Sequence, residues 1–364
     1  MKAATLKAFG SPLVVEEVPD PVLGTGEVIV DVIAAGVLAY SAEVYSGKRG
    51  YLMSLPMIPG SGPIGRVREV GPDATRLKAG DWVFCDPTIR SRDGGSAPDI
   101  ILQGLTAGSQ DAMGLQAHFH DGAYAEQMRL PTENVTPLGP IETAEAPLWC
   151  RLGALLVPFG GLLAIDLKAG EKVVVNGAAG RFGSAAVEVA LAMGAALVVA
   201  TGRNRDVLAD LSARLGSRVR TATMRGEEEA DRRTIIEAAE GPIDSVLDIL
   251  PPAATAAQVR AAVLAVRPNG RVALMGGVGM SGGAGLDLPY PWLMRNNIMV
   301  RGQWMYPRDA AARMVSMIRS GSVDLTRSTV TIFDLDQINE AVAHAARFAG
   351  PFEATVVRPA RQPP

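Results

Sequence analysis

The sequence predicts an α/β protein of two domains: a strand-rich first domain, and a second domain with a doubly wound parallel sheet. Its 364 residues exceed what one ordinary hydrophobic core holds, so we expect two domains. The first 150 residues carry short β-type runs broken by Gly and Pro, whereas from Lys172 apolar strands alternate with helix-like segments. Such alternation is typical of βαβ crossovers, which place helices on both faces of a parallel sheet.

Composition excludes several classes of protein. Hydrophobic residues make up 48% of the chain and charged residues 20%, the balance of a soluble globular protein. A net charge of −3 offers no basic surface to nucleic acid or anionic lipid, so neither is an expected partner. The N-terminal segment has no long apolar region and no run of about 18 apolar residues occurs, so we expect a cytoplasmic protein. Cys85 and Cys150 cannot form a disulfide framework and are expected to be buried thiols.

The elements of the first domain are predicted to be short strands. These strands are VIVDVIAAGV, GRVREVG, DWVFCDP and AYAEQMRLP, each bounded by Gly or Pro. Their spacing indicates a compact, mostly antiparallel or barrel-like domain. Residues 90–120 show no clear pattern and are expected to form a long loop region.

The second domain begins with a strand, a glycine turn, an alanine-rich helix and a second strand, in the segment KVVVNGAAGRFGSAAVEVALAMGAALVVATGR. The periodic segments IDSVLDIL, TAAQVRAAVLAVR, RVALMGG and NIMVRGQW continue the alternation. The tail, FDLDQINEAVAHAARF followed by FEATVVRP, returns to a helix and a strand.

The glycine turn has the spacing of a dinucleotide-binding fingerprint, with Ala178 in the first place of Ala178-x-Gly180-x-x-Gly183. Gly180 would let a pyrophosphate approach the backbone, and Gly183 would let the helix pack closely on the strand. The alternative is a small-residue helix that only packs tightly on its strand. The residues expected to contact the dinucleotide are Ala178, Ala179, Gly180, Arg181, Phe182 and Gly183, together with Gly276 and Gly277 at the end of a later strand.

Cofactor specificity is predicted from the end of the second strand, which has no acidic residue before Asp206. Rossmann domains that prefer NAD usually place a carboxylate here. A carboxylate would repel the 2′-phosphate of NADP(H), whereas guanidinium groups bind a phosphate. We therefore expect NADP(H), although an exposed basic loop would give the same pattern. The residues expected to contact it are Thr201, Gly202, Arg203, Asn204 and Arg205.

With these motifs, the chain resembles the medium-chain dehydrogenase/reductase superfamily from end to end. The matching pieces are PDPVLGTGEVIVDVIAAGV, PGSGPIGRVREVG, GDWVF, DGAYAEQ, AAGRFG, VRPNGRVALMGG and FDLDQINEA, in this order. The resemblance implies a GroES-like β-barrel catalytic domain in residues 1–155, a Rossmann NADP(H)-binding domain in 156–305, and a return segment in 306–364. It also implies that the strand NIMVRGQW pairs with its two-fold mate in a homodimer or homotetramer.

The chain departs from the zinc-dependent members at the metal ligands. Those members carry a Cys where this chain has Leu38, and a His-Glu pair in the motif that here contains Ser61 and Gly62. Cys150 matches a third ligand, but one thiolate cannot hold a metal that takes three protein ligands and a water. The four cysteines of the family's structural zinc lobe are also absent from residues 90–120. We therefore expect no bound metal, as in the zinc-free quinone oxidoreductases, enoyl reductases and some carbonyl reductases.

Without zinc, a hydrogen-bond donor must stabilise or protonate the oxygen that gains charge during hydride transfer. The resemblance places Tyr40 of GVLAYS where the zinc enzymes carry the hydroxyl of their proton relay. Tyr40 is the leading catalytic candidate, and the alternative is a Tyr in the cleft wall with its hydroxyl in water. Ser41 and Ser61 lie at or beside metal-shell positions and are the other candidates. His118 and His120 more often belong to loops or packing.

The expected function is zinc-independent, NADPH-dependent hydride transfer to a quinone or an α,β-unsaturated carbonyl compound. One alternative is NADPH-dependent reduction of ketones or aldehydes, which the alcohol-dehydrogenase-like segments APLWC and GVLAYS favour. The other is a non-catalytic NADPH-binding redox sensor, since a fold does not fix a function. In the two catalytic cases the partner is a small-molecule carbonyl compound or quinone.

Overall fold

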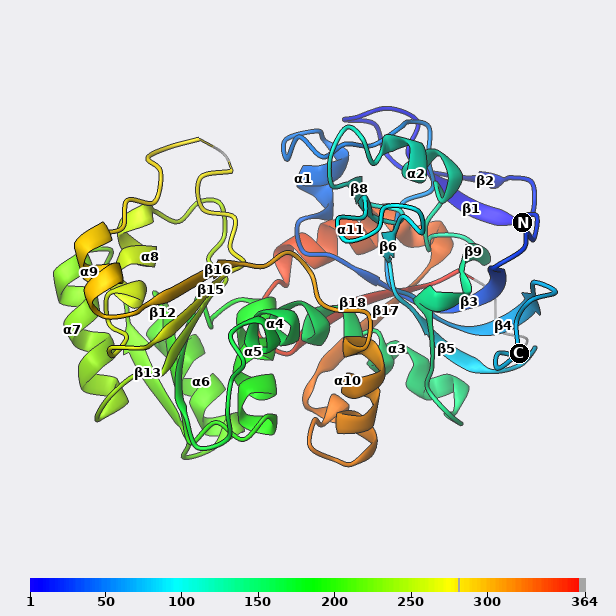
Figure 1. The fold of residues 1–364 in the computed structure, drawn as a ribbon. Coiled ribbons are helices and arrows are strands. Elements are labelled where there is room, and N and C mark those ends of the chain that lie inside the picture. The colour runs from blue at the N-terminus through cyan, green and yellow to red at the C-terminus, as the bar shows by residue number, and fades with distance from the viewer. Residues whose placement is uncertain (281, 360–364) are drawn as a thin grey trace. The chain divides into compact units, whose positions relative to one another are not determined.

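The computed structural model describes residues 1–280 and 282–359, which form two compact units (Figure 1). Unit 1 comprises Met1–Gly153, Leu325–Ala349 and the chain from Glu353, and unit 2 comprises Ala154–Asp324 with Gly350–Phe352. The predicted fold class, a GroES-like domain and a Rossmann domain with a parallel sheet, is confirmed. The predicted boundary at residue 306 is wrong, because the chain returns to unit 1 at Leu325.

Contacts within unit 2 explain the later boundary. A Cβ added at Gly160, in α4 (Leu152–Ala164), would overlap the carbonyl oxygen of Met305 and lie 2.8 Å from Tyr306 Cβ. The guanidinium group of Arg313, in α10 (Ala310–Arg319), stacks over the Phe159 ring at 5.3 Å. The segment before Leu325 therefore packs on α4 and stays in unit 2.

The sheet of unit 2 has six parallel strands in the order β13-β12-β11-β14-β15-β16. The strands are β11 (Lys172–Asn176), β12 (Leu197–Gly202), β13 (Val219–Thr223), β14 (Ser245–Asp248), β15 (Arg271–Leu274) and β16 (Met299–Gly302). The helices of this unit that follow or join these strands are α5 (Arg181–Ala192), α6 (Arg205–Leu215), α7 (Glu228–Ala239), α8 (Ala256–Val263) and α9 (Tyr290–Arg295). Strand order reverses between β11 and β14, and ligands of such sheets bind at the carboxyl ends beside this reversal.

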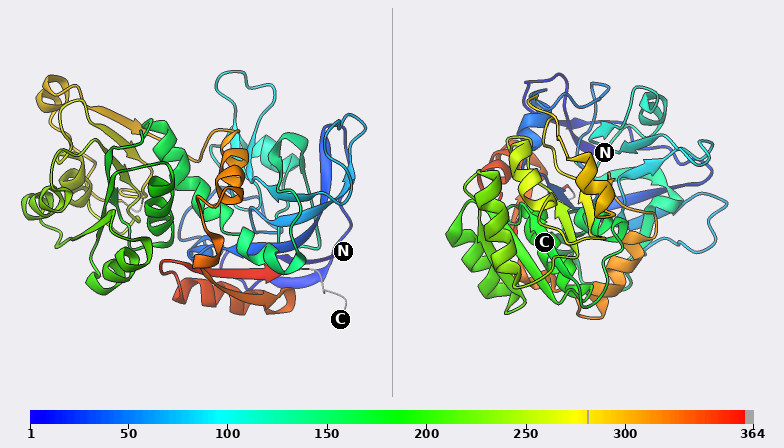
Figure 2. Two further views of the ribbon diagram at one scale, coloured as in Figure 1. Left: turned by 90° about the horizontal axis from the view of Figure 1, so that it is seen from below. Right: turned by 60° about the vertical axis from the view of Figure 1, so that its left-hand side comes forward.

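The main sheet of unit 1 is built around β3 (Glu27–Val37), which pairs with β4, β9 and β18. Its strand order is β10-β5-β4-β3-β18-β17, and β9 also pairs with β3. The other strands of this sheet are β4 (Ile64–Val70), β5 (Trp82–Cys85), β9 (Gln127–Pro131), β10 (Val135–Pro137), β17 (Thr329–Asp334) and β18 (Glu353–Arg358). In Figure 2 the red C-terminal strand and α11 (Ile338–Arg347) lie within unit 1, so the return segment completes its sheet.

The prediction of a loop over residues 90–120 is wrong in part. This region contains β6 (Thr88–Arg90), β7 (Ile100–Leu102), β8 (Thr106–Ala107) and α2 (Met113–His118). A small apolar cluster holds them together: Ile89, Ile101, Ala107, Ala112 and Phe119. Strands of two or three residues are too short to show a period in the sequence, which is why the prediction missed them.

One helical stretch of the described chain, Thr143–Ala164, is long and apolar enough to cross a membrane. Within its most apolar window, however, 78% of the residues are buried inside the protein. The stretch is therefore a core helix. Both cysteines are buried free thiols, as predicted.

Candidate functional site

The glycine turn joins β11 to α5 at the carboxyl end of the unit 2 sheet. Gly177 has a φ of +102°, a left-handed conformation that favours glycine. A Cβ added at Gly183 would overlap the Gly177 carbonyl oxygen and lie 2.7 Å from Ala178 Cα. Gly183 therefore lets α5 pack directly against the turn.

Gly180 differs from the other glycines of the turn. Its φ is −94°, which any residue adopts, and a Cβ there would meet nothing nearer than the Gly177 oxygen at 3.9 Å. Neither packing nor backbone conformation therefore requires glycine at this exposed position. It is the N-cap residue of α5 and, as a glycine, offers no side-chain hydrogen bond to the helix amides. The amides of its first turn can bind the phosphate groups of a dinucleotide that approaches over Gly180.

Thr201 has a different place from the one expected of a cofactor-contacting residue. Its side chain is 1% exposed, and its Oγ1 accepts a hydrogen bond from the Gly177 amide at 3.1 Å. The same hydroxyl donates to Asn176 Oδ1 at 2.8 Å. Thr201 therefore holds the turn from beneath.

The loop after β12 leaves two guanidinium groups exposed, those of Arg203 and Arg205. The Asn204 side chain caps α6, because its Oδ1 accepts from the amides of Asp206 at 3.0 Å and Val207 at 3.2 Å. Asn204 is therefore explained by helix capping without a cofactor contact.

Sequence reasoning missed Arg225, which follows the neighbouring strand β13. The amide of Met224 donates to the Gly202 carbonyl at 2.8 Å, so the chain before Arg225 runs directly beside the end of β12. Arg225 is exposed and adds a third arginine to this edge of the sheet. The available signal was its position just after a strand of the parallel sheet.

Gly276 and Gly277 both have a packing explanation. A Cβ at Gly276 would lie 2.7 Å from the Leu250 carbonyl oxygen, and one at Gly277 would lie 2.7 Å from Pro252 Cγ. The loop after β15 therefore passes close to the loop after β14. Contact with a cofactor is not needed to explain either glycine.

Sequence reasoning also missed Asp248, the last residue of β14, which is 2% exposed. Burial raises the pKa of its carboxyl group to about 7, although hydrogen bonds from Asn176 and from the Leu250 backbone act to lower that pKa. The available signal was a single acid inside the apolar run IDSVLDIL.

In unit 1, GVLAYS spans the end of β3, a turn and the start of α1 (Ser41–Tyr45). Tyr40 is half-buried, and the Arg49 guanidinium group lies 4.2 Å from the centre of its ring. Ser41 is 1% exposed, so it lies in the interior of the unit. Burial raises the pKa of Tyr45 to about 12. Of the two catalytic candidates in GVLAYS, Tyr40 is half-buried and Ser41 is fully buried.

Ser61 is half-buried and lies between two glycines with positive φ, Gly60 and Gly62. A Cβ at Gly60 would lie 2.6 Å from the Tyr124 ring, and the Tyr124 hydroxyl donates to the Gly36 carbonyl at 3.4 Å. Tyr124 therefore packs between the segment PGSG and the strand that leads into GVLAYS. It brings Ser61 and Tyr40 into one region of unit 1.

The metal-ligand positions of this region do not provide a zinc site. Leu38, Ser61 and Gly62 carry no thiol, imidazole or carboxylate, and the buried Cys150 thiol donates to the Ala146 carbonyl at 3.6 Å. In residues 1–280 and 282–359, no three His, Cys, Asp or Glu side chains form a cluster that could hold a metal. One thiol does not fit the donor set of catalytic zinc.

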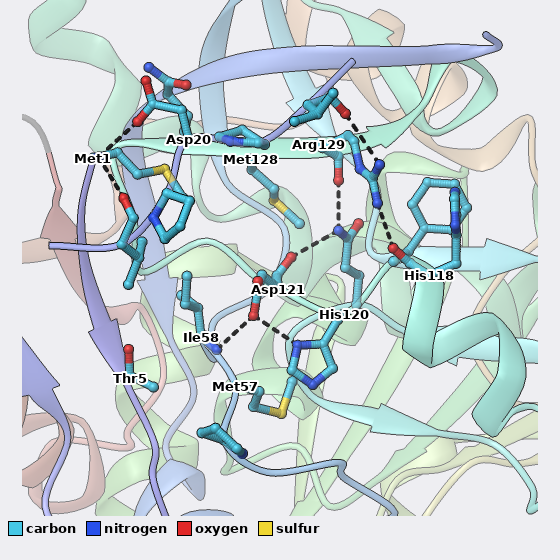
Figure 3. Close-up of a pocket in the computed structure, with 18 of the residues that line it drawn as sticks. Met1, Thr5, Asp20, Met57, Ile58, His118, His120, Asp121, Met128 and Arg129 are labelled. Carbon is cyan, nitrogen blue, oxygen red and sulfur yellow. Dashed lines mark hydrogen bonds and ion pairs between the residues drawn. The ribbon is translucent and has the colours of Figure 1, made fainter. Parts of the chain in front are cut away.

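The two candidate histidines line a cavity of about 590 Å³ in unit 1 (Figure 3). His120 Nδ1 lies 2.9 Å from Asp121 Oδ1 and its Nε2 donates to the Ser54 carbonyl at 2.8 Å. Its hydrogen bond with Asp121 raises the pKa of His120. His118 Nε2 lies 2.8 Å from the buried Glu27 carboxylate. Both imidazoles are thus held by neighbouring groups, as expected of packing residues.

Two family models match the chain. Residues 24–140 match the alcohol dehydrogenase GroES-like domain, and residues 182–320 match the zinc-binding dehydrogenase domain.

Curated relatives include dehydrogenases and a reductase. An alcohol dehydrogenase of Geobacillus stearothermophilus is 35% identical over 53% of this chain and 56% of its own length. An L-threonine 3-dehydrogenase of Ruegeria pomeroyi is 27% identical over 90% of this chain and 91% of its own length. An acryloyl-coenzyme A reductase of Metallosphaera sedula is 31% identical over 55% and 58%, respectively. The chain thus spans about half the length of the first of these relatives.

Solved structures share the fold across nearly the whole chain. A thermostable alcohol dehydrogenase from Pyrobaculum aerophilum has a TM-score of 0.75 at 23% identity and covers 99% of both chains. The alcohol dehydrogenase of Thermus sp. ATN1 has a TM-score of 0.77 at 23% identity, covering 98% of this chain and 100% of its own. Because both family models match the chain, and its relatives and the solved structures agree with them, the chain belongs to the medium-chain dehydrogenase/reductase superfamily.

Proposed function

We propose that the protein is an NADPH-dependent oxidoreductase that transfers hydride to a small-molecule acceptor without zinc. The observation that carries this proposal is Gly180, a glycine that neither packing nor backbone conformation requires. The missing side chain at the start of α5 leaves room for a pyrophosphate to approach the N-terminus of the helix. A bound nicotinamide would supply the hydride in this site.

The preference for NADPH is supported by the charges at the carboxyl edge of the unit 2 sheet. Arg203, Arg205 and Arg225 are exposed there, and no acid lies between β12 and Arg205. Guanidinium groups bind a phosphate through charge-assisted hydrogen bonds, worth about 1.5 to 3 kcal/mol. NADPH is therefore expected to bind roughly tenfold to a hundredfold more tightly than NADH.

For the chemistry, Tyr40 of unit 1 is the proton donor, and Ser61 of the same unit is the second polar group. Tyr40 is half-buried, and its phenol O–H can donate to a developing oxyanion. The Arg49 guanidinium group lies over the ring and is itself held by an ion pair with Glu43 at 2.8 Å, so it fixes the position of the phenol. Ser41 is too deeply buried to meet a substrate directly.

The acceptor is a quinone or an α,β-unsaturated carbonyl compound, because Leu38, Ser61 and Gly62 do not provide the ligands of a zinc ion that would act as a Lewis acid on a plain carbonyl. A relative whose name is acryloyl-coenzyme A reductase supports this class. Reduction of ketones or aldehydes is the second candidate, and relatives named alcohol dehydrogenase favour it.

The test is oxidation of NADPH with a panel of quinones, enals and ketones, with and without a chelator. We expect turnover with a quinone or an enal that the chelator leaves unchanged. Preferred turnover of ketones would favour the second candidate. Loss of activity with chelator, or one zinc per chain in elemental analysis, would contradict the metal-independent mechanism. Binding of NADPH without turnover of any acceptor would point to a redox sensor.

A further inference from the structure

Three polar side chains lie side by side at the carboxyl ends of the central strands of the unit 2 sheet. Asn176 ends β11, Asp248 ends β14, and Thr201 is the penultimate residue of β12. Asn176 is the direct register partner of Thr201 on one side and of Asp248 on the other. Asn176 and Thr201 are each 1% exposed and Asp248 is 2% exposed, so the whole row is buried.

The hydrogen bonds of this row all run in one direction. The Gly177 amide donates to Thr201 Oγ1 at 3.1 Å, and the Thr201 hydroxyl donates to Asn176 Oδ1 at 2.8 Å. Asn176 Nδ2 then donates to Asp248 Oδ1 at 2.7 Å and to the Gln258 carbonyl at 3.2 Å. Both acceptors are oxygens, which fixes the orientation of the Asn176 amide. The Asp248 carboxyl group is thus the terminal acceptor of a chain that begins at the glycine turn, and aligned bonds of this kind strengthen one another.

Asp248 is expensive to bury, and its surroundings are built closely around it. A Cβ at Gly276 would lie 2.8 Å from Asp248 Oδ2, so the loop after β15 closes over the carboxyl group. An apolar side chain would fit the interior of β14 at lower cost. A buried acid at the end of this row therefore serves a purpose that strand packing does not explain.

We infer that Asp248 is a positioning residue for the dinucleotide: through Asn176 and Thr201 it fixes the amide of Gly177 and so the shape of the turn that receives the pyrophosphate. The inference rests on the proposed function of unit 2 in dinucleotide binding. Gly177 needs such a restraint because a glycine at a φ of +102° has many other conformations available. Holding the turn ready lowers the ordering cost when the ligand binds.

The test measures the Kd of NADPH and of NADH by fluorescence titration, without substrate. Thr201→Val keeps the volume and the branched Cβ but removes the hydroxyl that links Gly177 to Asn176. Its Kd should rise about threefold to tenfold for both dinucleotides equally, because both carry the pyrophosphate. Thr201→Ser should restore the affinity, and Asp248→Asn should weaken both dinucleotides in the same way.

Two control variants distinguish the positioning of the glycine turn from a general loss of stability and from a loss of 2′-phosphate binding. Ser245→Ala removes a buried hydroxyl from the opposite end of β14 and should leave both Kd values unchanged. Arg203→Ala should weaken NADPH alone. Melting temperatures are measured for every variant.

Unchanged Kd values in Thr201→Val and Asp248→Asn, with lowered melting temperatures, would overturn the inference and leave the row a structural feature only. Weakening of NADPH alone would overturn it too, because the effect would then act at the 2′-phosphate. If Thr201→Val fails to fold, Asp248→Asn and Thr201→Ser decide the question. An unaltered protein that binds neither dinucleotide would instead contradict the proposed function.

Discussion

Replacement of Gly183 by alanine adds one methyl group where α5 meets the glycine turn. That carbon would overlap the Gly177 carbonyl oxygen and lie 2.7 Å from Ala178 Cα. Both neighbours are backbone atoms of the turn, so no flexible side chain can move aside and the helix itself must shift. Overpacking of this kind costs about 1 to 3 kcal/mol. For a domain of this size the melting temperature should fall by about 2 to 12 °C.

Gly180→Ala is the matched control, because it adds the same methyl group three residues earlier. Nothing lies within 3.9 Å of that carbon, and the φ of −94° suits alanine. Its melting temperature should be unchanged or slightly higher. Alanine lowers the conformational entropy of the unfolded chain, which stabilises the folded protein by about 0.4 to 1 kcal/mol. Its affinity for NADPH should fall, because the methyl group occupies the approach to the helix amides.

The assay is thermal unfolding followed by circular dichroism, with an NADPH titration of each variant. A Gly180→Ala variant that melts earlier and binds NADPH normally would refute the division of roles between the two glycines. So would equal losses of stability in both variants.

Tyr40→Phe keeps the ring stacked under Arg49 and removes only the hydroxyl, so the melting temperature and the NADPH affinity should hold while turnover falls roughly a hundredfold to a thousandfold. A loss below about threefold, on an acceptor that the unaltered enzyme reduces well, would place Tyr40 in the pocket wall. The edge strand β16 carries Met299 with 49% exposure, and Tyr290 and Met294 of the preceding helix α9 are also exposed, so we expect at least a dimer by light scattering and a monomer after Met299→Lys. A monomeric mass for the unaltered protein would contradict this assembly. Burial raises the pKa of Asp248 in the folded state to about 7, above its ordinary value of 3.8, so the folded state binds the proton more tightly and this group makes the protein less stable as pH rises between these values. Relative to the unaltered protein, Asp248→Asn should therefore gain stability between about pH 4 and pH 8, by up to about 4 kcal/mol in urea unfolding, and a constant difference across that range would contradict the buried ionisation.

The predicted architecture was correct where local patterns are long. The valines of β11 are fully buried, as a continuous apolar run predicts for a central parallel strand, and the glycine turn follows them directly. The boundary at Leu325 was missed because it depends on contacts such as that of Tyr306 with Gly160, which no local pattern reveals. The strands around Ile89 and Ile101 were missed because each is only three residues long.

At the candidate site, the sequence indicated the segments that form the site. It was less informative about the role of each side chain. Thr201 was predicted to contact the cofactor, yet its hydroxyl bonds to Asn176 and to the Gly177 amide. Asp248 lies 72 residues from Asn176 along the chain, so their hydrogen bond depends on strand order and register. Neither property can be read from a single sequence, because it arises when the sheet assembles.

The most direct test of the account is the Kd of the unaltered protein for NADPH and for NADH, measured by titration at the same ionic strength. Exposed Arg203, Arg205 and Arg225, with no acid at the end of β12, predict that NADPH binds roughly tenfold to a hundredfold more tightly. Rising salt should narrow that difference, because exposed charges are screened. Equal affinity for the two dinucleotides, or tighter binding of NADH, would contradict the proposed cofactor, and failure to bind either would contradict the proposed function.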